Sequence, residues 1–98
     1  MNQNKSLRTI VIDCDGVIAG KDHRGRYADA SPLSYGVEQV NKLYDMGYEV
    51  VLHTARYGDR EAGDVRMQYQ RGYVEWLHWL EKHGIKYHKA FMGKPAGV

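Results

Sequence analysis

Three short apolar segments alternate with two segments of helical periodicity, and this alternation restricts the fold more than any other feature. The first, residues 9–12, is a β-branched run without polar alternation, which is typical of a strand buried on both faces of a parallel sheet. Further apolar segments follow at residues 48–53 and 85–92. Strands separated by helices predict an α/β fold whose parallel sheet is built by right-handed crossovers and flanked by helices.

Capping residues and glycines mark the two predicted helices. Ser31 and Pro32 fit the N-cap and first position of one helix, and Gly47 fits its terminator. A second helix is predicted over residues 65–83. Its core-facing stripe comprises Tyr69, Tyr73, Trp76, Leu77 and Leu80. Trp79 falls outside this stripe, so we expect it to be exposed and available as a contact surface.

The length of 98 residues predicts one small domain spanning residues 1–98. Within it, residues 17–29 are glycine-containing and charged, and are predicted to form a small flap hairpin. No segment is apolar enough to span a membrane, and the first residues lack the apolar region of a secretory signal. The one cysteine, Cys14, cannot form an internal disulfide, and its predicted role is packing. These features predict a cytoplasmic protein with no membrane partner.

Two carboxylates follow the first predicted strand, at the end where parallel α/β sheets bind ligands. Asp13 and Asp15 are separated by one residue and precede Gly16. Such a pair offers hard oxygen ligands for Mg²⁺, or a nucleophile beside a proton-transfer group. Aspartate followed by glycine is also common in turns without any catalytic role.

Further polar residues follow the other two predicted strands. The Thr54 hydroxyl and the backbone N–H groups after it, beginning at Ala55, can hold a phosphate oxygen. Arg56 offers a fork that suits an anionic substrate group, although it also fits a solvated surface arginine. Lys94 can neutralise charge shared by the aspartates and a phosphoryl group, although it also fits a polar tail. Together these groups predict a phosphoryl site.

The sequence resembles the haloacid dehalogenase (HAD) superfamily. VIDCDGVI is similar to the first motif of that family, in which a hydrophobic strand precedes DxDG followed by Thr or Val. VVLHTAR resembles the second motif, and GKP supplies the lysine of the third. The resemblance covers nearly the whole chain and implies a Rossmann-like sheet. The segments between the motifs are too short for a cap domain, so the implied type is capless.

The resemblance implies a role for each matched residue. Asp13 corresponds to the nucleophile and Asp15 to the general acid and base of the family's phosphatases. Thr54 corresponds to a hydrogen-bond donor to the phosphoryl group, and Lys94 to the cation that positions this group against Asp13. The implied Mg²⁺ ligands are the Asp13 carboxylate, the backbone carbonyl of Asp15 and an acid from a fourth motif.

The chain departs from the family at this fourth motif. Its strand and acidic residues would follow the lysine, but the sequence ends at Val98 and has no acid after Glu81. We therefore expect the fourth core strand to be missing and the edge of the first strand to be exposed. An apolar edge of this kind favours association. We therefore expect that either further residues of the chain or a second copy of it covers this edge, and the second case would give a homo-oligomer joined through the first strand.

The predicted function is a Mg²⁺-dependent phosphatase that forms an aspartyl-phosphate intermediate. A small sugar phosphate is the first expected substrate, because the sequence also resembles small capless HAD proteins of capsular polysaccharide biosynthesis. One alternative is a polynucleotide 3′-phosphatase, whose nucleic-acid substrate would suit the basic flap residues Lys21, His23, Arg24 and Arg26. The other alternative is a catalytically weak binding or assembly module with the same fold.

Overall fold

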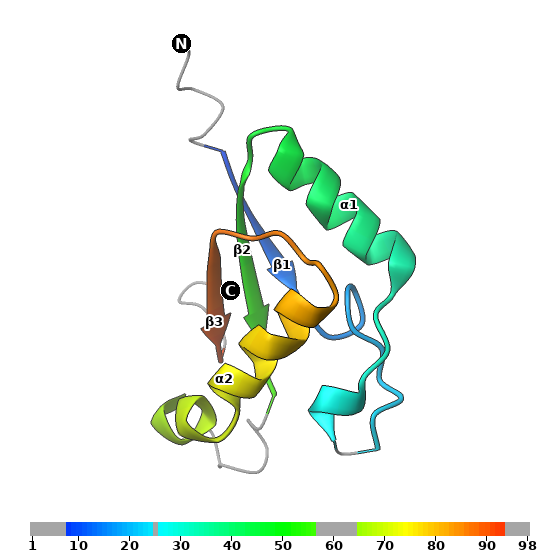
Figure 1. Ribbon diagram of the computed structural model, residues 1–98. Coiled ribbons are helices and arrows are strands. Elements are labelled where there is room, and N and C mark those ends of the chain that lie inside the picture. Colours follow the sequence, from blue (N-terminus) through cyan, green and yellow to red (C-terminus); the bar gives the residue numbers. More distant parts are fainter. Residues whose placement is uncertain (1–7, 25, 57–64, 94–98) are drawn as a thin grey trace.

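The computed structural model describes residues 8–24, 26–56 and 65–93 (Figure 1). Its elements in chain order are β1 (Thr9–Asp13), the 3₁₀-helix η2 (Tyr27–Asp29), α1 (Ser34–Asp45), β2 (Glu49–Thr54), α2 (Val65–Lys82) and β3 (Lys89–Met92). This alternation of strands and helices confirms the predicted α/β class. No helix among the described residues has both the length and the apolar character needed to cross a membrane.

The three strands form a parallel sheet in the order β1-β2-β3. The register sets Asp13 beside His53, and Thr54 beside Met92. All three carboxyl ends therefore lie at one edge of the sheet, as the sequence predicts. β3 is shorter than the predicted strand 85–92, because the chain first turns away from α2 through a hydrogen bond from the Ile85 N–H to the Leu80 carbonyl (3.0 Å).

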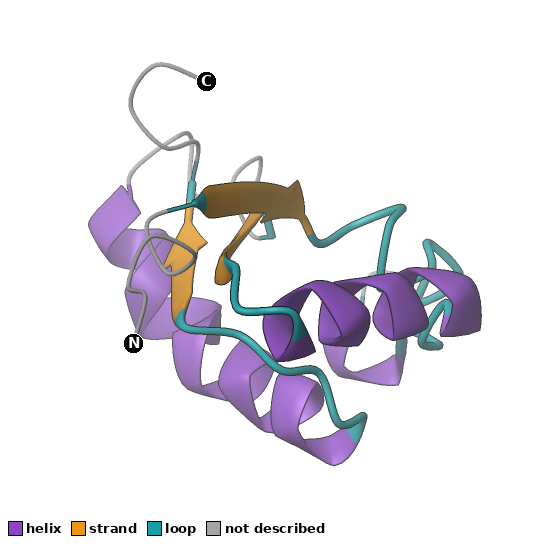
Figure 2. Ribbon diagram, turned by 90° about the horizontal axis from the view of Figure 1, so that it is seen from above, coloured by secondary structure: helices purple, strands orange, loops and turns teal. Residues whose placement is uncertain are grey.

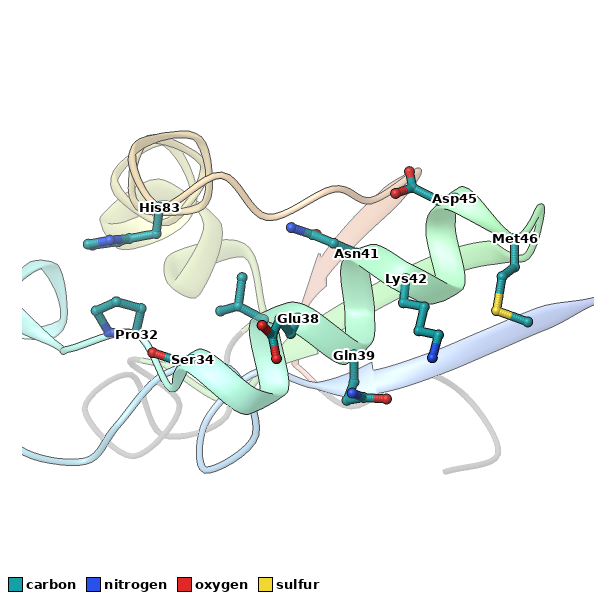
Figure 3. A pocket seen from close by; sticks show the side chains of 10 residues that line it. Pro32, Ser34, Glu38, Gln39, Asn41, Lys42, Asp45, Met46 and His83 are labelled. Carbon is teal, nitrogen blue, oxygen red and sulfur yellow. The ribbon is translucent and has the colours of Figure 1, made fainter.

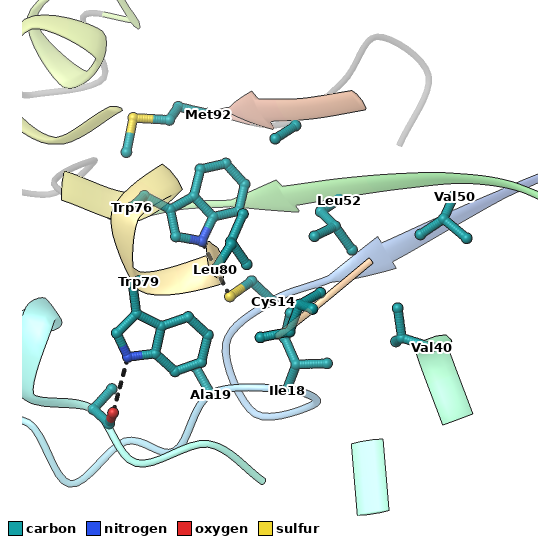
Figure 4. Close-up of a cluster of buried hydrophobic side chains, with 13 residues drawn as sticks. Cys14, Ile18, Ala19, Val40, Val50, Leu52, Trp76, Trp79, Leu80 and Met92 are labelled. Carbon is teal, nitrogen blue, oxygen red and sulfur yellow. Dashed lines mark hydrogen bonds between the residues drawn. The ribbon is translucent and has the colours of Figure 1, made fainter. Parts of the chain in front are cut away.

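Both helices lie on one face of the sheet, and the core fills the space between these two layers (Figure 2). The core cluster joins Val40 of α1 to Trp76 and Leu80 of α2 across the strand residues Val50 and Leu52 (Figure 4). On the opposite face of the sheet, large side chains remain in contact with solvent. Val11 is 46% exposed and Phe91 41% exposed. The prediction that β1 is buried on both faces is therefore wrong for the part of the chain that the structure describes.

The predicted stripe of α2 faces the core, with Trp76 and Leu80 buried and its other members partly buried. Trp79 is only 2% exposed, so the prediction of an exposed contact surface is wrong. The reason is that η2 packs against α2 and widens its buried arc. The indole Nε1–H of Trp79 donates a hydrogen bond to the Ala30 carbonyl (2.9 Å), which attaches α2 to the end of the flap.

The described residues of the flap form a loop that contains η2, which differs from the predicted hairpin; Gly25, in the predicted turn, lies outside them. An antiparallel bridge between Ala19 and Pro32 closes its base. The Ser31 N–H and hydroxyl both donate to the Asp22 carboxylate, and these bonds hold the pKa of Asp22 below its usual value. Ser31 bonds to Asp22 and Pro32 pairs with Ala19, so neither residue caps the helix. As a result α1 begins at Ser34, later than the capping pattern predicts.

Gly36 allows α1 to lie directly against the start of the flap. A Cβ atom at this position would lie 1.7 Å from the Val17 carbonyl oxygen, which is backbone and cannot rotate away. Helix propensity alone predicts that Gly36→Ala stabilises the protein by about 1 kcal/mol. The contact with Val17 predicts the opposite effect, a decrease of about 1–3 kcal/mol in the free energy of unfolding, because the added methyl group overpacks the contact.

Urea unfolding of Gly36→Ala tests this prediction, with Gln39→Ala on the exposed side of the same helix as the control. We expect Gly36→Ala to unfold at a lower urea concentration than the wild type, while the control unfolds close to it. An unchanged or higher midpoint for Gly36→Ala would contradict the close contact.

Cys14 is fully buried, as predicted for a packing role, and the Trp76 indole Nε1–H lies 3.4 Å from its sulfur. Burial, followed by the charge of Asp15, raises the pKa of the Cys14 thiol to about 12.

We expect a disulfide reagent at pH 8 to leave native protein unlabelled and to label one thiol in concentrated urea. Since the folded pKa exceeds that of the unfolded chain, this group also stabilises the fold less as pH rises above about 9. Rapid labelling of native protein would contradict this packing.

Candidate phosphoryl-transfer site

A tight turn follows β1 and sets the positions of the two aspartates. The Cys14 carbonyl oxygen accepts hydrogen bonds from the N–H groups of Val17, Ile18 and Ala19, at 2.9–3.2 Å. Gly16 makes the turn possible because its φ of +89° lies in a region that side chains disfavour. As a result Cys14 points into the core, whereas Asp13 is exposed and Asp15 partly buried at the sheet edge.

Asp15 joins the ends of β1 and β2 through its side chain. The Thr54 hydroxyl donates a hydrogen bond of 2.5 Å to Asp15 Oδ2. Arg56 Nε donates to the other oxygen, Asp15 Oδ1, at 3.4 Å and forms an ion pair with it. The sequence predicts these three residues as site residues separately, and the structure brings them into one hydrogen-bonded group.

The hydroxyl of Thr54 is used twice within this group. It donates to Asp15, and its oxygen accepts the backbone N–H of Arg56 at 3.2 Å. A hydroxyl carries a single proton, so a phosphoryl oxygen that bonds to Thr54 must compete with Asp15 for it. Ala55, the next residue, is exposed, so the chain directly after β2 is accessible to solvent.

The Arg56 side chain is almost completely buried, with 1% of its surface exposed. Its guanidinium carbon lies 5.2 Å from the ring centroid of Tyr27 in η2 and 5.3 Å from that of Trp79 in α2. Cations within about 6 Å of an aromatic centroid are attracted by the ring face. Asp15 thus has as its partner an arginine held inside the protein, rather than one on the surface.

Two further cations belong to the predicted site or lie close to it. Lys94 lies outside the described residues, but the preceding Gly93 N–H donates to the Thr54 carbonyl at 2.8 Å. The last described residue before Lys94 is therefore attached to the end of β2. The flap contributes Lys21, whose Cε lies 3.5 Å from the point where a Cβ of Gly16 would be. Lys21 thus brings positive charge close to the turn that carries the aspartates.

The donor set fits a hard cation more closely than a transition metal. Asp13 supplies an exposed carboxylate and the turn supplies backbone carbonyls, and both are oxygen ligands of the type that Mg²⁺ prefers. Among the described residues there is no group of three or more histidine, cysteine, aspartate or glutamate side chains that could enclose a metal. Mg²⁺ often binds through one or two carboxylates, with water and substrate phosphate as the remaining ligands, so these residues fit it.

A groove elsewhere on the molecule contains none of the predicted site residues. It has a volume of about 750 Å³ and runs along α1, with His83 at one side (Figure 3). Its charged lining residues Glu38, Lys42 and Asp45 all come from α1. The group of residues with the chemistry of a phosphoryl site is therefore the one at the strand ends.

Sequence reasoning missed Tyr27 and Trp79 as neighbours of the site. Both contact Arg56 through tertiary packing of η2 and α2 at the end of β2. The only relevant signal in the sequence is the pair of aromatic residues itself, because neither lies close to Arg56 along the chain. The proximity of Lys21 to Gly16 likewise depends on how the flap folds back.

No family model and no curated protein sequence matches the chain. Solved structures do match. A target protein from Vibrio cholerae is 25% identical, with a TM-score of 0.79, and the match covers 91% of this chain and 72% of that one. A chain of the Pnkp1/Rnl/Hen1 complex is 18% identical, with a TM-score of 0.65, over 95% of this chain and 30% of that one.

A third match is the D,D-heptose 1,7-bisphosphate phosphatase from B. bronchiseptica, solved with magnesium and phosphate. It is 21% identical, with a TM-score of 0.59, and the match covers 94% of this chain and 54% of the phosphatase. At identities of 18% and 21%, the matches to the Pnkp1/Rnl/Hen1 chain and to the heptose bisphosphate phosphatase establish the fold alone. The chain therefore has the Rossmann-like fold of these solved proteins over nearly its whole length, with the aspartate and threonine motifs where its strand ends meet, as the resemblance to the haloacid dehalogenase superfamily implies.

Proposed function

We propose that the chain is a Mg²⁺-dependent phosphatase that hydrolyses phosphomonoesters through an aspartyl-phosphate intermediate. The observation that carries the proposal is the 2.5 Å hydrogen bond between Thr54 and Asp15, which joins the ends of β1 and β2. This contact joins a carboxylate to a hydroxyl donor at the carboxyl edge of the sheet, where β1 ends with the exposed carboxylate of Asp13. Nucleophilic phosphoryl transfer needs these three kinds of group.

In the first step, an oxygen of the Asp13 carboxylate attacks phosphorus and the bond to the ester oxygen breaks. The electron pair of that bond goes to the leaving oxygen, which takes a proton from Asp15. In the second step, Asp15 accepts a proton from water while the water oxygen attacks phosphorus. The bond between phosphorus and Asp13 breaks, which releases phosphate and restores the carboxylate. Mg²⁺, held by Asp13 and the backbone carbonyl of Asp15, would neutralise phosphoryl charge.

The other site residues would bind the phosphoryl group. Thr54 transfers its hydroxyl hydrogen bond from Asp15 to a phosphoryl oxygen, and the backbone N–H of Ala55 is proposed to bind the same group. The Gly16 N–H donates to the Ala19 carbonyl at 2.8 Å, so it would have to exchange that bond to bind a phosphoryl oxygen. Lys94 is proposed to place its ammonium group against the phosphoryl oxygens, as the resemblance implies. Exchange at Thr54 would also free one oxygen of Asp15 for proton transfer at the moment when substrate is bound.

A small sugar phosphate is the proposed substrate, because one of the structural matches is a heptose bisphosphate phosphatase. The exposed cations Lys21 and Arg24 favour a second candidate, the 3′-phosphate end of a nucleic acid. Steady-state assays of a sugar phosphate and a 3′-phosphorylated oligonucleotide separate the two. An oligonucleotide substrate should also lose affinity steeply as salt is raised, whereas a sugar phosphate should not.

The nucleophile is tested with Asp13→Asn, which replaces the attacking carboxylate by an amide. We expect Mg²⁺-dependent release of phosphate from p-nitrophenyl phosphate to fall by about three orders of magnitude or more. Asp45→Asn is the matched control, since Asp45 is an exposed aspartate paired with Lys86 at 2.9 Å. Equal activity of the wild type and Asp13→Asn would refute the mechanism, and an inactive wild type would favour a binding module.

The proton-transfer role is tested with Asp15→Asn. This variant retains the nucleophile, so a rapid-mixing experiment should still show a burst of p-nitrophenolate equal to the enzyme concentration. Subsequent turnover should fall by about 10²–10⁴-fold, because no carboxylate accepts the proton of the attacking water. Steady turnover at the wild-type rate would assign the proton transfer to another group.

A further inference from the structure

We infer that Arg56 is a positioning residue for Asp15, held in place by the flap and α2, and this inference rests on the proposed phosphatase function. The sequence predicts that Arg56 contacts substrate. Its side chain is, however, only 1% exposed, while the Asp15 side chain that it faces is 24% exposed. The guanidinium thus lies beneath the carboxylate, and the carboxylate lies between the guanidinium and solvent.

The contacts fix Asp15 at both of its oxygens. Arg56 Nε holds Oδ1 and the Thr54 hydroxyl holds Oδ2. These two donors are not equivalent, because the Thr54 hydroxyl has one proton and the substrate competes for it. When Thr54 turns to a phosphoryl oxygen, the bond from Arg56 to Oδ1 remains. Arg56 is therefore the contact that keeps the carboxylate in place while its other oxygen transfers a proton.

Arg56 is itself positioned by two rings from separate segments. Tyr27 lies in the flap and Trp79 lies in α2, and both rings are within 5.3 Å of the guanidinium carbon. Trp79 also donates to Ala30 at the end of the flap, so these two segments are attached to each other. The orientation of Asp15 consequently depends on the flap being folded against α2.

A role in positioning predicts a specific kinetic pattern for Arg56→Gln. The leaving group of p-nitrophenyl phosphate departs without a proton, whereas that of an alkyl phosphate needs one from Asp15. Arg56→Gln should therefore reduce kcat for an alkyl phosphate by about 10–100-fold, the cost of a carboxylate displaced by about 1 Å. The burst of p-nitrophenolate should change far less, and KM for either substrate should not rise more than about threefold above the wild type.

The double variant Asp15→Asn/Arg56→Gln separates positioning from substrate contact. If Arg56 acts through Asp15, Arg56→Gln should add no further loss once Asp15 has been replaced. A raised KM, or an equal loss in both backgrounds, would overturn the inference and assign Arg56 to substrate. Lys86→Gln is the control for removal of a cation paired with a carboxylate, because its partner Asp45 lies on the exposed surface.

Tyr27→Leu keeps the inference testable if Arg56→Gln does not fold, which thermal melting will reveal. This variant removes one ring from the guanidinium and leaves the ion pair in place. It should show the same selective loss toward the alkyl phosphate, smaller than for Arg56→Gln. An equal loss in single-turnover release of the alcohol and in the burst of p-nitrophenolate, which both report the first step, would overturn the inference. A wild-type chain without Mg²⁺-dependent activity overturns the proposed function and this inference together, whereas an active wild type with the wrong pattern overturns the inference alone.

Discussion

The carbonyl oxygen of Cys14 accepts three consecutive backbone N–H groups, and the arrangement of the site depends on this one acceptor. The turn that it closes reverses the chain directly after β1, which directs the Cys14 sulfur into the core and leaves the flanking aspartates at the sheet edge. Gly16 provides the required backbone conformation. The buried Cys14 and the exposed Asp13 are thus two results of the same turn, which explains how one of two adjacent side chains lies in the core and the other at the sheet edge.

The β1–β2 register carries this local geometry across the sheet. Parallel pairing of Asp13 with His53 brings Thr54 within hydrogen-bond distance of Asp15, although the two residues are 39 positions apart. The apolar runs and the amphipathic stripe of α2 were sufficient to predict the class and the meeting of these strand ends. The spacing of apolar residues within one segment shows which face of that strand or helix packs in the core, and it can be seen without knowing the rest of the fold.

Contacts made by the flap could not be predicted in the same way. The stripe of α2 identifies the face toward the sheet, but Trp79 is buried by η2, which packs on the helix from a second direction. Arg56 is buried for a related reason, since Asp15, Tyr27 and Trp79 come from three distant segments. An arginine gives no local signal of burial, because its charge is accommodated only when such partners converge. The start of α1 differed because Ser31 bonds to Asp22 instead of to the helix.

The closed base of the flap also has a consequence for how the chain can change in length. Ala19 and Pro32 pair across the base, and Asp22 and Ser31 hold the segments just beyond it together. Residues inserted between Asp22 and Tyr27 would begin and end at points that are already held together. The entropic cost of closing the longer loop would therefore grow only slowly with the number of inserted residues. An additional lobe could therefore be inserted here at a low cost in stability. Such a lobe would be connected to Asp15 through Tyr27, which contacts Arg56, the ion-pair partner of Asp15.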